Sequence, residues 1–126
     1  MTPANRAPLL LLLVCGACFS ERGAGPGVAG ECRVPVTVID STHFIVAIRN
    51  FAFHPDSLAV PSGATVTWLD CEDAGTQPHT TTSQTAVWSS PNLTTGARFS
   101  HTFATPGSFP YYCAVHPYML GKIVAQ

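Results

Sequence analysis

Residues 108–124 read SFPYYCAVHPYMLGKIV, and this stretch decides the fold that we expect. Its two ends, 108–113 and 121–124, are short and rich in aromatic or β-branched residues, which favours two strands joined by a tight loop. Around that loop stand three side chains with soft or borderline donor atoms, spaced three residues apart: Cys113, His116 and Met119. A strand that ends at Cys113 and enters a tight loop can direct all three side chains onto one point.

A fourth donor, His79, begins another predicted strand after a long acidic loop. One thiolate, two imidazoles and one thioether form a set that suits copper, because sulfur ligands favour Cu(I) and imidazoles also accept Cu(II). The sequence therefore predicts one copper ion held by His79, Cys113, His116 and Met119. A site that compromises between the two oxidation states needs little rearrangement when an electron moves, which indicates single-electron transfer.

Other metal and catalytic sites fit these residues less well. Structural zinc normally takes four Cys or His ligands and no Met, and iron–sulfur clusters need more cysteines than this chain can gather. A nucleophilic Cys–His dyad would lack an obvious orienting Asn or Asp and would leave Met119 unexplained. Taken singly, each of these residues more often has no role in metal binding. Met119 could fill a gap in the core, Cys113 could be an inert buried thiol, and His116 could be an ordinary loop residue. The order and spacing of the three together favour copper.

Short segments with alternating or β-branched residues recur along the chain, and no helical period of useful length is present. Val66 and Trp68 alternate with threonines, which places both on one face of a half-buried strand. Turn residues such as those at 40–42 and 61–63 separate the segments. Strands are expected over 33–39, 44–51, 57–60, 65–69, 79–83, 99–103, 108–113 and 121–124. Many short strands at regular spacing predict an all-β sandwich.

Length and charge narrow the class of protein. A chain of 126 residues suits one domain, and apolar residues make up 46%, enough for a core. Only 10% of the residues are charged and the formal net charge is -1, so there is no electrostatic case for binding nucleic acid.

The N-terminal residues indicate export. Arg6 places a positive charge ahead of the unbroken apolar run 9–14, which is too short to span a bilayer. A buried helix of the domain is the alternative, and it is disfavoured because Gly, Pro and Ala break the chain over 23–30. We expect an export signal over 1–18, a Gly-rich linker over 19–31 and a copper-binding domain over 32–126.

Two cleavage schemes are compatible with these residues. Cys15-Gly16-Ala17-Cys18 partly matches a bacterial lipoprotein box, in which Cys18 would receive lipid, although Cys15 stands where that box usually has Leu. Ordinary cleavage near 27–29 is the alternative. The expected location is the periplasm, or the outer face of a bacterial membrane with the lipid on Cys18 as the only membrane contact.

Four blocks carry a family resemblance: FHP at 53–55, PSGATVTW at 61–68, HT at 79–80 and YCAVHPYMLG at 112–121. They resemble the cupredoxins, the type 1 blue-copper proteins, of the plastocyanin and amicyanin kind. The resemblance implies an antiparallel Greek-key β-sandwich with copper near one end. It also implies that His79 is the N-terminal ligand and that Cys113, His116 and Met119 are the ligands of the C-terminal loop.

Two details of the resemblance bear on the ligand loops. The two residues between His116 and Met119 match the short amicyanin-type loop, whereas plastocyanins have a longer one. Many members of the family have Asn at the position of Thr80, where it ties the two ligand loops together. A Thr hydroxyl can make the same tie more weakly.

The implied function is electron transport rather than catalysis. His116, with Pro117, Tyr118 and Leu120 around it, is the expected docking surface for redox partner proteins, and the chain is expected to be a monomer.

Two alternatives to electron transport remain open. A periplasmic copper carrier or storage protein would have more open Met- or His-rich sites, and a domain of a copper oxidase or nitrite reductase would need further His pairs, for which we find no suitable spacing.

The cysteines of the expected domain are Cys32, Cys71 and Cys113. Export permits a disulfide, and an odd number leaves at least one thiol, which copper requires to be Cys113. In the family's sandwich the second strand runs parallel to the strand at 65–69, which would bring Cys32 and Cys71 to the copper end. A Cys32–Cys71 disulfide is therefore expected, with two free thiols as the alternative.

The remaining histidines are expected to lie outside the copper site. His43 begins a strand and is expected to be exposed, and His54 lies at a corner beside a proline. His101 shares strand parity with Phe99 and Phe103, which predicts a partly buried structural role.

Overall fold

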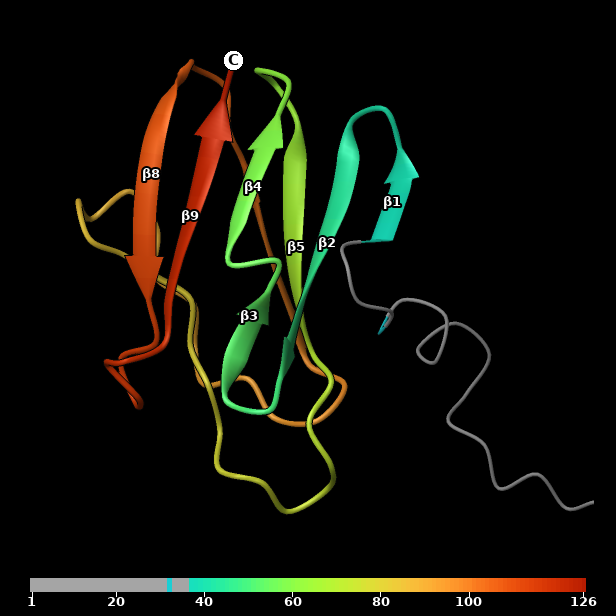
Figure 1. Ribbon diagram of the computed structural model, residues 1–126, viewed down its shortest axis with the longest axis vertical. Coiled ribbons are helices and arrows are strands. Elements are labelled where there is room, and N and C mark those ends of the chain that lie inside the picture. The colour runs from blue at the N-terminus through green and yellow to red at the C-terminus, as the bar shows by residue number, and fades with distance from the viewer. Residues whose placement is uncertain (1–31, 33–36) are drawn as a thin grey trace, which may run out of the picture.

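The computed structural model describes Cys32 and residues 37–126, drawn in colour in Figure 1. The expected export signal, the Gly-rich linker, the lipid site at Cys18 and the start of the first predicted strand lie outside the described residues. No helix in this described part of the chain is long and apolar enough to cross a membrane.

Two β-sheets form the described domain, as the strand pattern predicted. One sheet has the order β1-β2-β5-β7 with β3 beside β2, and the other has the order β4-β9-β8-β6. Most neighbours are antiparallel, but β2–β5 and β4–β9 are parallel. The strands are β1 Thr37–Asp40, β2 His43–Arg49, β3 Ala52–His54, β4 Ser57–Val60, β5 Thr65–Asp70, β6 Thr82–Ser83, β7 Arg98–Thr102, β8 Gly107–Tyr112 and β9 Leu120–Ala125.

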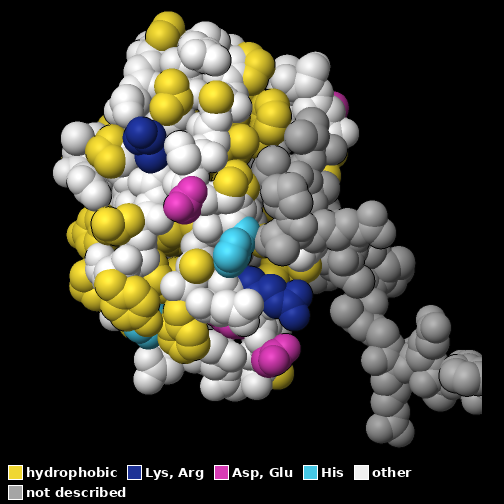
Figure 2. Space-filling model, in the orientation of Figure 1, with side chains coloured by type: hydrophobic (Ala, Val, Ile, Leu, Met, Phe, Trp, Pro, Cys, Tyr) yellow, Lys and Arg dark blue, Asp and Glu magenta, His cyan; other side chains and the backbone are white. Residues whose placement is uncertain are grey.

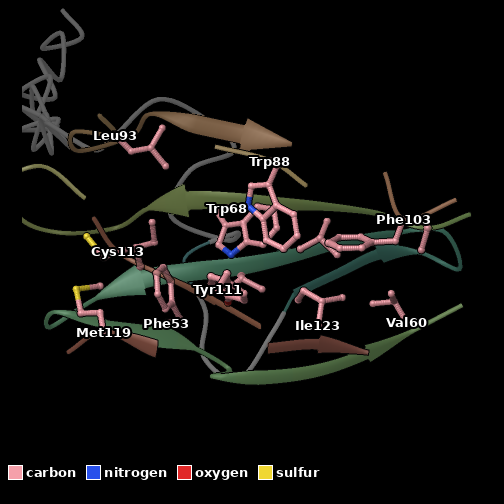
Figure 3. Close-up of a cluster of buried hydrophobic side chains, with 14 of the residues drawn as sticks. Phe53, Val60, Trp68, Trp88, Leu93, Phe103, Tyr111, Cys113, Met119 and Ile123 are labelled. Atoms are coloured by element: carbon pink, nitrogen blue, oxygen red, sulfur yellow. The ribbon is translucent and has the colours of Figure 1, made fainter. Parts of the chain in front are cut away.

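The core between the sheets follows from strand alternation. Val66 and Trp68 of β5 are fully buried, whereas Thr65 and Thr67 turn outward and hydrogen bond through their hydroxyls to side chains of β7. Trp68 stacks on Trp88 with ring centroids 5.5 Å apart and meets Tyr111 edge-on at 5.3 Å. These large aromatic side chains lie between the sheets (Figure 3), and their burial removes apolar surface from water, which stabilises the fold.

The second predicted strand, 44–51, is too long. β2 ends at Arg49 because Asn50 and Phe51 adopt left-handed backbone angles, with φ of 53° and 55°. Such angles are typical of the two-residue turn that joins antiparallel strands, and β3 follows at once with Arg49 paired to Ala52. The turn moves Phe51 out of the sheet and to the end of the molecule where the predicted copper ligands lie.

The strand predicted over 79–83 is also shorter than expected. Only Thr82 and Ser83 pair with β8, and His79 forms an isolated bridge with Leu93 instead. The intervening backbone N–H groups of Thr80 and Thr81 point to the side chains of Cys113 and Ser90, so they do not join a strand ladder.

A disulfide joins Cys32 to Cys71, with a Cα–Cα distance of 5.7 Å, which confirms the predicted pairing. Cys113 is the free cysteine of the described residues and it is buried. The disulfide anchors the chain ahead of β1 to the start of the loop that follows β5. That loop and the loop after β8 both lie at the end of the sandwich opposite the C-terminus (Figure 1).

Candidate metal centre

The four predicted ligand residues lie at one end of the sandwich. Cys113 directly follows β8, so the strand holds its sulfur at the edge of the core, where Cys113 has no exposed surface. His116 and Met119 follow in the loop that leads into β9. His79 lies at the end of the long loop that begins after β5, a strand of the other sheet.

Three donor atoms converge at this point. The sulfur of Cys113 lies 3.9 Å from Nδ1 of His79 and 3.8 Å from Nδ1 of His116, and the two Nδ1 atoms lie 3.2 Å apart. These residues are the cluster of potential metal-ligating groups found in the described part of the chain. With bonds of about 2.3 Å to sulfur and about 2.0 Å to nitrogen, trigonal coordination separates sulfur from nitrogen by about 3.7 Å and the nitrogens by about 3.5 Å. The observed triangle therefore fits one metal ion.

Met119, the fourth predicted ligand residue, is buried in the core. Its side chain is 2% exposed, and its sulfur lies at the same end of the core as the sulfur of Cys113 (Figure 3). The loop is closed by two backbone bonds: Cys113 N–H donates to the Met119 carbonyl at 3.0 Å, and Met119 N–H donates to the His116 carbonyl at 2.9 Å. These two backbone bonds close the short loop that carries Cys113, His116 and Met119.

Thr80 connects the two ligand-bearing segments. Its backbone N–H points at the sulfur of Cys113 at 3.3 Å, and its hydroxyl accepts a hydrogen bond from Ala114 N–H at 2.7 Å. The N–H of His116 also points at the sulfur, at 3.4 Å. Donors of this kind stabilise negative charge on sulfur, as a metal-binding thiolate requires.

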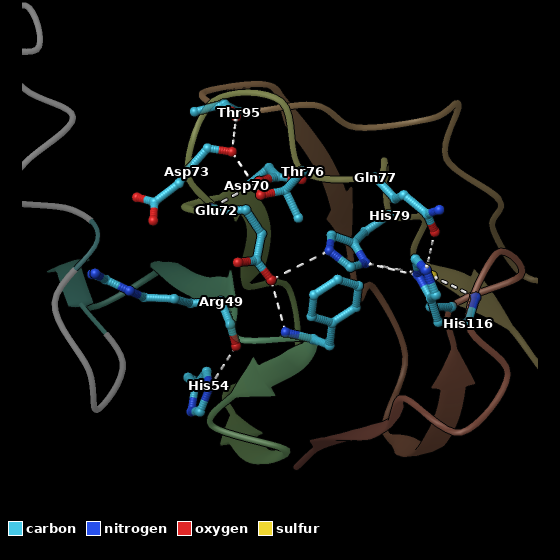
Figure 4. Close-up of polar contacts among 12 residues, drawn as sticks. Arg49, His54, Asp70, Glu72, Asp73, Thr76, Gln77, His79, Thr95 and His116 are labelled. Atoms are coloured by element: carbon cyan, nitrogen blue, oxygen red, sulfur yellow. Dashed lines mark hydrogen bonds and ion pairs between the residues drawn. The ribbon is translucent and has the colours of Figure 1, made fainter.

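A buried acidic pair stands behind His79. Asp70 is 1% exposed and Glu72 is 8% exposed, and Glu72 N–H donates to Asp70 Oδ1 at 3.0 Å. Burial raises the pKa of Asp70. Burial also lowers the pKa of His79, against the opposing effect of the two acids, which favours the neutral imidazole that a metal needs. Figure 4 shows Glu72 facing the ring of His79 on the side away from His116.

Three contributors to this end of the molecule were not predicted. Phe51 meets His79 and His116 edge-on, with ring centroids 5.2 Å and 5.1 Å away, and Glu72 and Gln77 face the outer nitrogens of the same two rings. The only signal in the sequence was that the loop after β5 is acidic and leads to His79. The sequence alone does not show which residues of this loop face the two rings, because that depends on how the strands are arranged.

The other histidines lie elsewhere, as expected. His43 is exposed and contacts the Asp40 carboxylate at 2.8 Å, and His54 contacts the Arg49 carbonyl at 3.0 Å. His101 is partly buried and stacks on Trp88, with ring centroids 5.1 Å apart. Each ring therefore has a structural contact that accounts for its position.

The surface beside the cluster is apolar. Tyr118 is 67% exposed and Leu120 is 58% exposed, and Figure 2 shows hydrophobic side chains gathered at the end of the molecule that carries this loop. A groove of about 530 Å³ runs between the 51–56 segment and the loop residues 118–120.

Comparison with known proteins agrees with this geometry. Residues 10–125 match the family model of a cupredoxin-like domain. Amicyanin from Paracoccus denitrificans is 30% identical over 84 residues, which span 65% of this chain and 64% of that protein.

One solved structure matches this architecture over nearly all of its chain, and a second matches it in one part. A purple cupredoxin from Nitrosopumilus maritimus is 30% identical with a TM-score of 0.58. The match spans 65% of this chain and 98% of the purple cupredoxin. A Cu-containing nitrite reductase from Thermus scotoductus is 27% identical with a TM-score of 0.61, over 65% of this chain but only 22% of the reductase.

Proposed function

The chain belongs to the cupredoxin-like family, and on that premise we propose that it is a type 1 blue-copper protein that carries single electrons between redox partners. The observation that carries this proposal is the convergence of one thiolate sulfur and two imidazole Nδ1 atoms within 4.8 Å of one another. Amicyanin is a relative by sequence, and the resemblance to amicyanins supports this function.

In this proposal, His79, Cys113, His116 and Met119 hold one copper ion. Copper supplies one-electron chemistry by alternating between Cu(I) and Cu(II). The soft sulfur donors and the imidazoles together suit both states. Zinc sites in proteins normally have Cys, His or carboxylate ligands, so zinc would not account for the thioether of Met119.

The protein's contribution is a donor set that keeps its positions. Cys113 is fixed by β8 and by the backbone bond to Met119, and the neighbouring segment is tied through Thr80. His79 is wholly buried. Side chains held in this way change little between oxidation states, so less of the free energy of electron transfer is spent on rearrangement.

Electrons are proposed to leave and enter through the edge of His116, which is the less buried of the two histidine rings. Pro117, Tyr118 and Leu120 are exposed around it and form the proposed docking surface for redox partner proteins. An apolar patch of this kind favours brief, weakly specific contacts, because few polar groups must be paired.

Export to the periplasm remains part of the proposal. A disulfide such as Cys32–Cys71 is stable in an oxidising compartment, which supports export but does not identify the signal. The segments 1–18 and 19–31, the domain over 32–126 and a lipid on Cys18 stay predictions, as does the monomeric state.

Two other functions compete with electron transfer. The similarity to one part of a nitrite reductase favours an enzyme domain as a second candidate, and a copper carrier or storage protein is the third. An electron carrier should cycle reversibly at an electrode over many scans without losing copper to a chelator, and should not turn over nitrite or oxygen. Rapid loss of Cu(I) to the chelator would favour a carrier of copper, and steady turnover would favour an enzyme.

A further inference from the structure

Both histidines of the centre present the same ring atom to Cys113. Nδ1 of His79 and Nδ1 of His116 face the sulfur, so each ring directs Nε2 outward. An imidazole that binds metal through Nδ1 carries its hydrogen on Nε2, and an acceptor there sets the orientation and tautomer of the ring. The acceptors that face the two Nε2 atoms therefore matter for the centre.

Both acceptors come from residues 71–78, which we call the clamp loop. Oε1 of Glu72 lies 3.4 Å from Nε2 of His79, and Oε1 of Gln77 lies 3.0 Å from Nε2 of His116 (Figure 4). The clamp loop is itself held at its start, because Cys71 is bonded to Cys32 and its N–H donates to the Ile48 carbonyl at 2.8 Å.

The Glu72 contact is the more constrained of the two. His79 has no exposed surface, and its Nε2 has no other hydrogen-bond partner in the described part of the chain. A buried N–H without an acceptor is costly. The 3.4 Å separation is long for a hydrogen bond, but the carboxylate of Glu72 is the group positioned to compensate.

The same oxygen of Glu72 has a second role. It accepts a hydrogen bond from Phe51 N–H at 2.7 Å. Phe51 has a φ of 55°, an unfavourable angle for a large side chain, and its ring covers the edges of both imidazoles. Glu72 thus stabilises the turn that carries the covering ring as well as the orientation of His79.

We propose that Glu72 and Gln77 are positioning residues that hold the outer nitrogens of His79 and His116, so that the clamp loop orients both imidazoles. The role in orienting copper ligands rests on the proposed function, but the contacts themselves are present without metal. They can therefore be tested in the metal-free protein.

The test compares three substitutions with two controls by NMR of the histidine ring nitrogens in the metal-free protein. Glu72→Met removes the acceptor at similar size, Glu72→Gln keeps an acceptor without the charge, and Gln77→Ala removes the second acceptor. Asp73→Asn and Gln84→Ala alter exposed side chains of the same types and serve as controls.

In the wild type, His79 should be mainly the Nε2–H tautomer with slow exchange of that hydrogen. Glu72→Met should speed the exchange roughly tenfold or more, as loss of one hydrogen bond to a charged group does. Glu72→Gln should retain the tautomer with a smaller, few-fold increase, which keeps the test available if the Met variant does not fold. Gln77→Ala should act on His116 alone, and the controls on neither ring. Unchanged exchange at His79 in both Glu72 variants, or at His116 in Gln77→Ala, overturns the proposal.

With copper bound, the reduction potential distinguishes an effect of Glu72 on the metal centre from a general effect on the fold. Loss of the buried negative charge in Glu72→Gln should shift the reduction potential upward, because the more highly charged Cu(II) state loses stabilisation. The exposed charge of Asp73 is screened by solvent, so its loss should shift the potential far less. Equal shifts in the two variants contradict a specific role for Glu72. Absence of copper binding in the wild type would contradict the proposed function but would not affect the NMR test of the positioning role.

Discussion

The hydroxyl of Thr80 accepts a 2.7 Å hydrogen bond from the backbone N–H of Ala114. These residues directly follow His79 and Cys113, so this one bond ties the two ligand-bearing segments together across 34 residues of sequence. The tie that many cupredoxins make with Asn is thus made here by Thr, as the resemblance allowed.

Thr80→Val keeps the shape of the side chain and removes this acceptor. Ala114 N–H then lacks its partner, and we expect the metal-free domain to lose about 1–2 kcal/mol of unfolding free energy. Urea unfolding followed by tryptophan fluorescence measures it. Thr67→Val, which removes an exposed hydroxyl of β5 far from the centre, is the matched control and should cost less. Equal losses for the two variants contradict a special role for Thr80.

Met119→Gln replaces the thioether by a harder oxygen donor. Such a donor favours Cu(II), so the protein should keep a coloured site while its reduction potential falls. Voltammetry of the two proteins under the same conditions provides the comparison. An unchanged potential means that Met119, although buried at the centre, is not a ligand.

Removing the Cys32–Cys71 disulfide by the double change Cys32→Ser and Cys71→Ser tests the anchor of the clamp loop. The bond closes a loop with a sequence separation of 39, for which the chain-entropy model gives about 3–4 kcal/mol of stabilisation. We expect the midpoint of urea unfolding to fall accordingly. A midpoint equal to that of the unreduced wild type argues that the bond does not form in the purified protein.

The burial of His101 predicts a dependence of stability on pH. Burial lowers its pKa in the folded protein below the ordinary value of 6.5. Between the ordinary value of 6.5 and the lowered folded-state pKa, the unfolded chain therefore binds more protons than the folded chain. The free energy of unfolding falls as pH falls through this window and recovers as pH rises past 6.5. His101→Phe keeps a ring against Trp88 and should flatten this part of the curve in the metal-free protein. Parallel pH profiles for the two proteins contradict the assignment.

Much of the sandwich was predictable because its strands alternate. Val66 and Trp68 face the core as their spacing required, and Gly107–Tyr112 and Leu120–Ala125 form the two strands expected around the metal loop. β3 was missed because it has three residues and is followed by Pro55, which leaves too few positions for alternation to be seen.

The donor set was predictable for a different reason. Cys113, His116 and Met119 lie within one short loop, so local spacing brings them together. Glu72 and Gln77 face rings that lie 7 and 39 residues away in sequence, and no local rule specifies that distance. Phe51 was assigned to a strand because aromatic residues favour strands, but the tight β2–β3 connection placed it in a left-handed turn over the centre.

The most direct test of the central claim is the visible and EPR spectrum of the purified domain during titration with Cu(II), recorded for the wild type and for Cys113→Ala. The claim predicts an intense blue or green thiolate-to-copper band that saturates at one copper per chain in the wild type and is absent from the variant. An intense band that survives in Cys113→Ala, or a wild type that binds Cu(II) without such a band, would contradict the assignment of this centre.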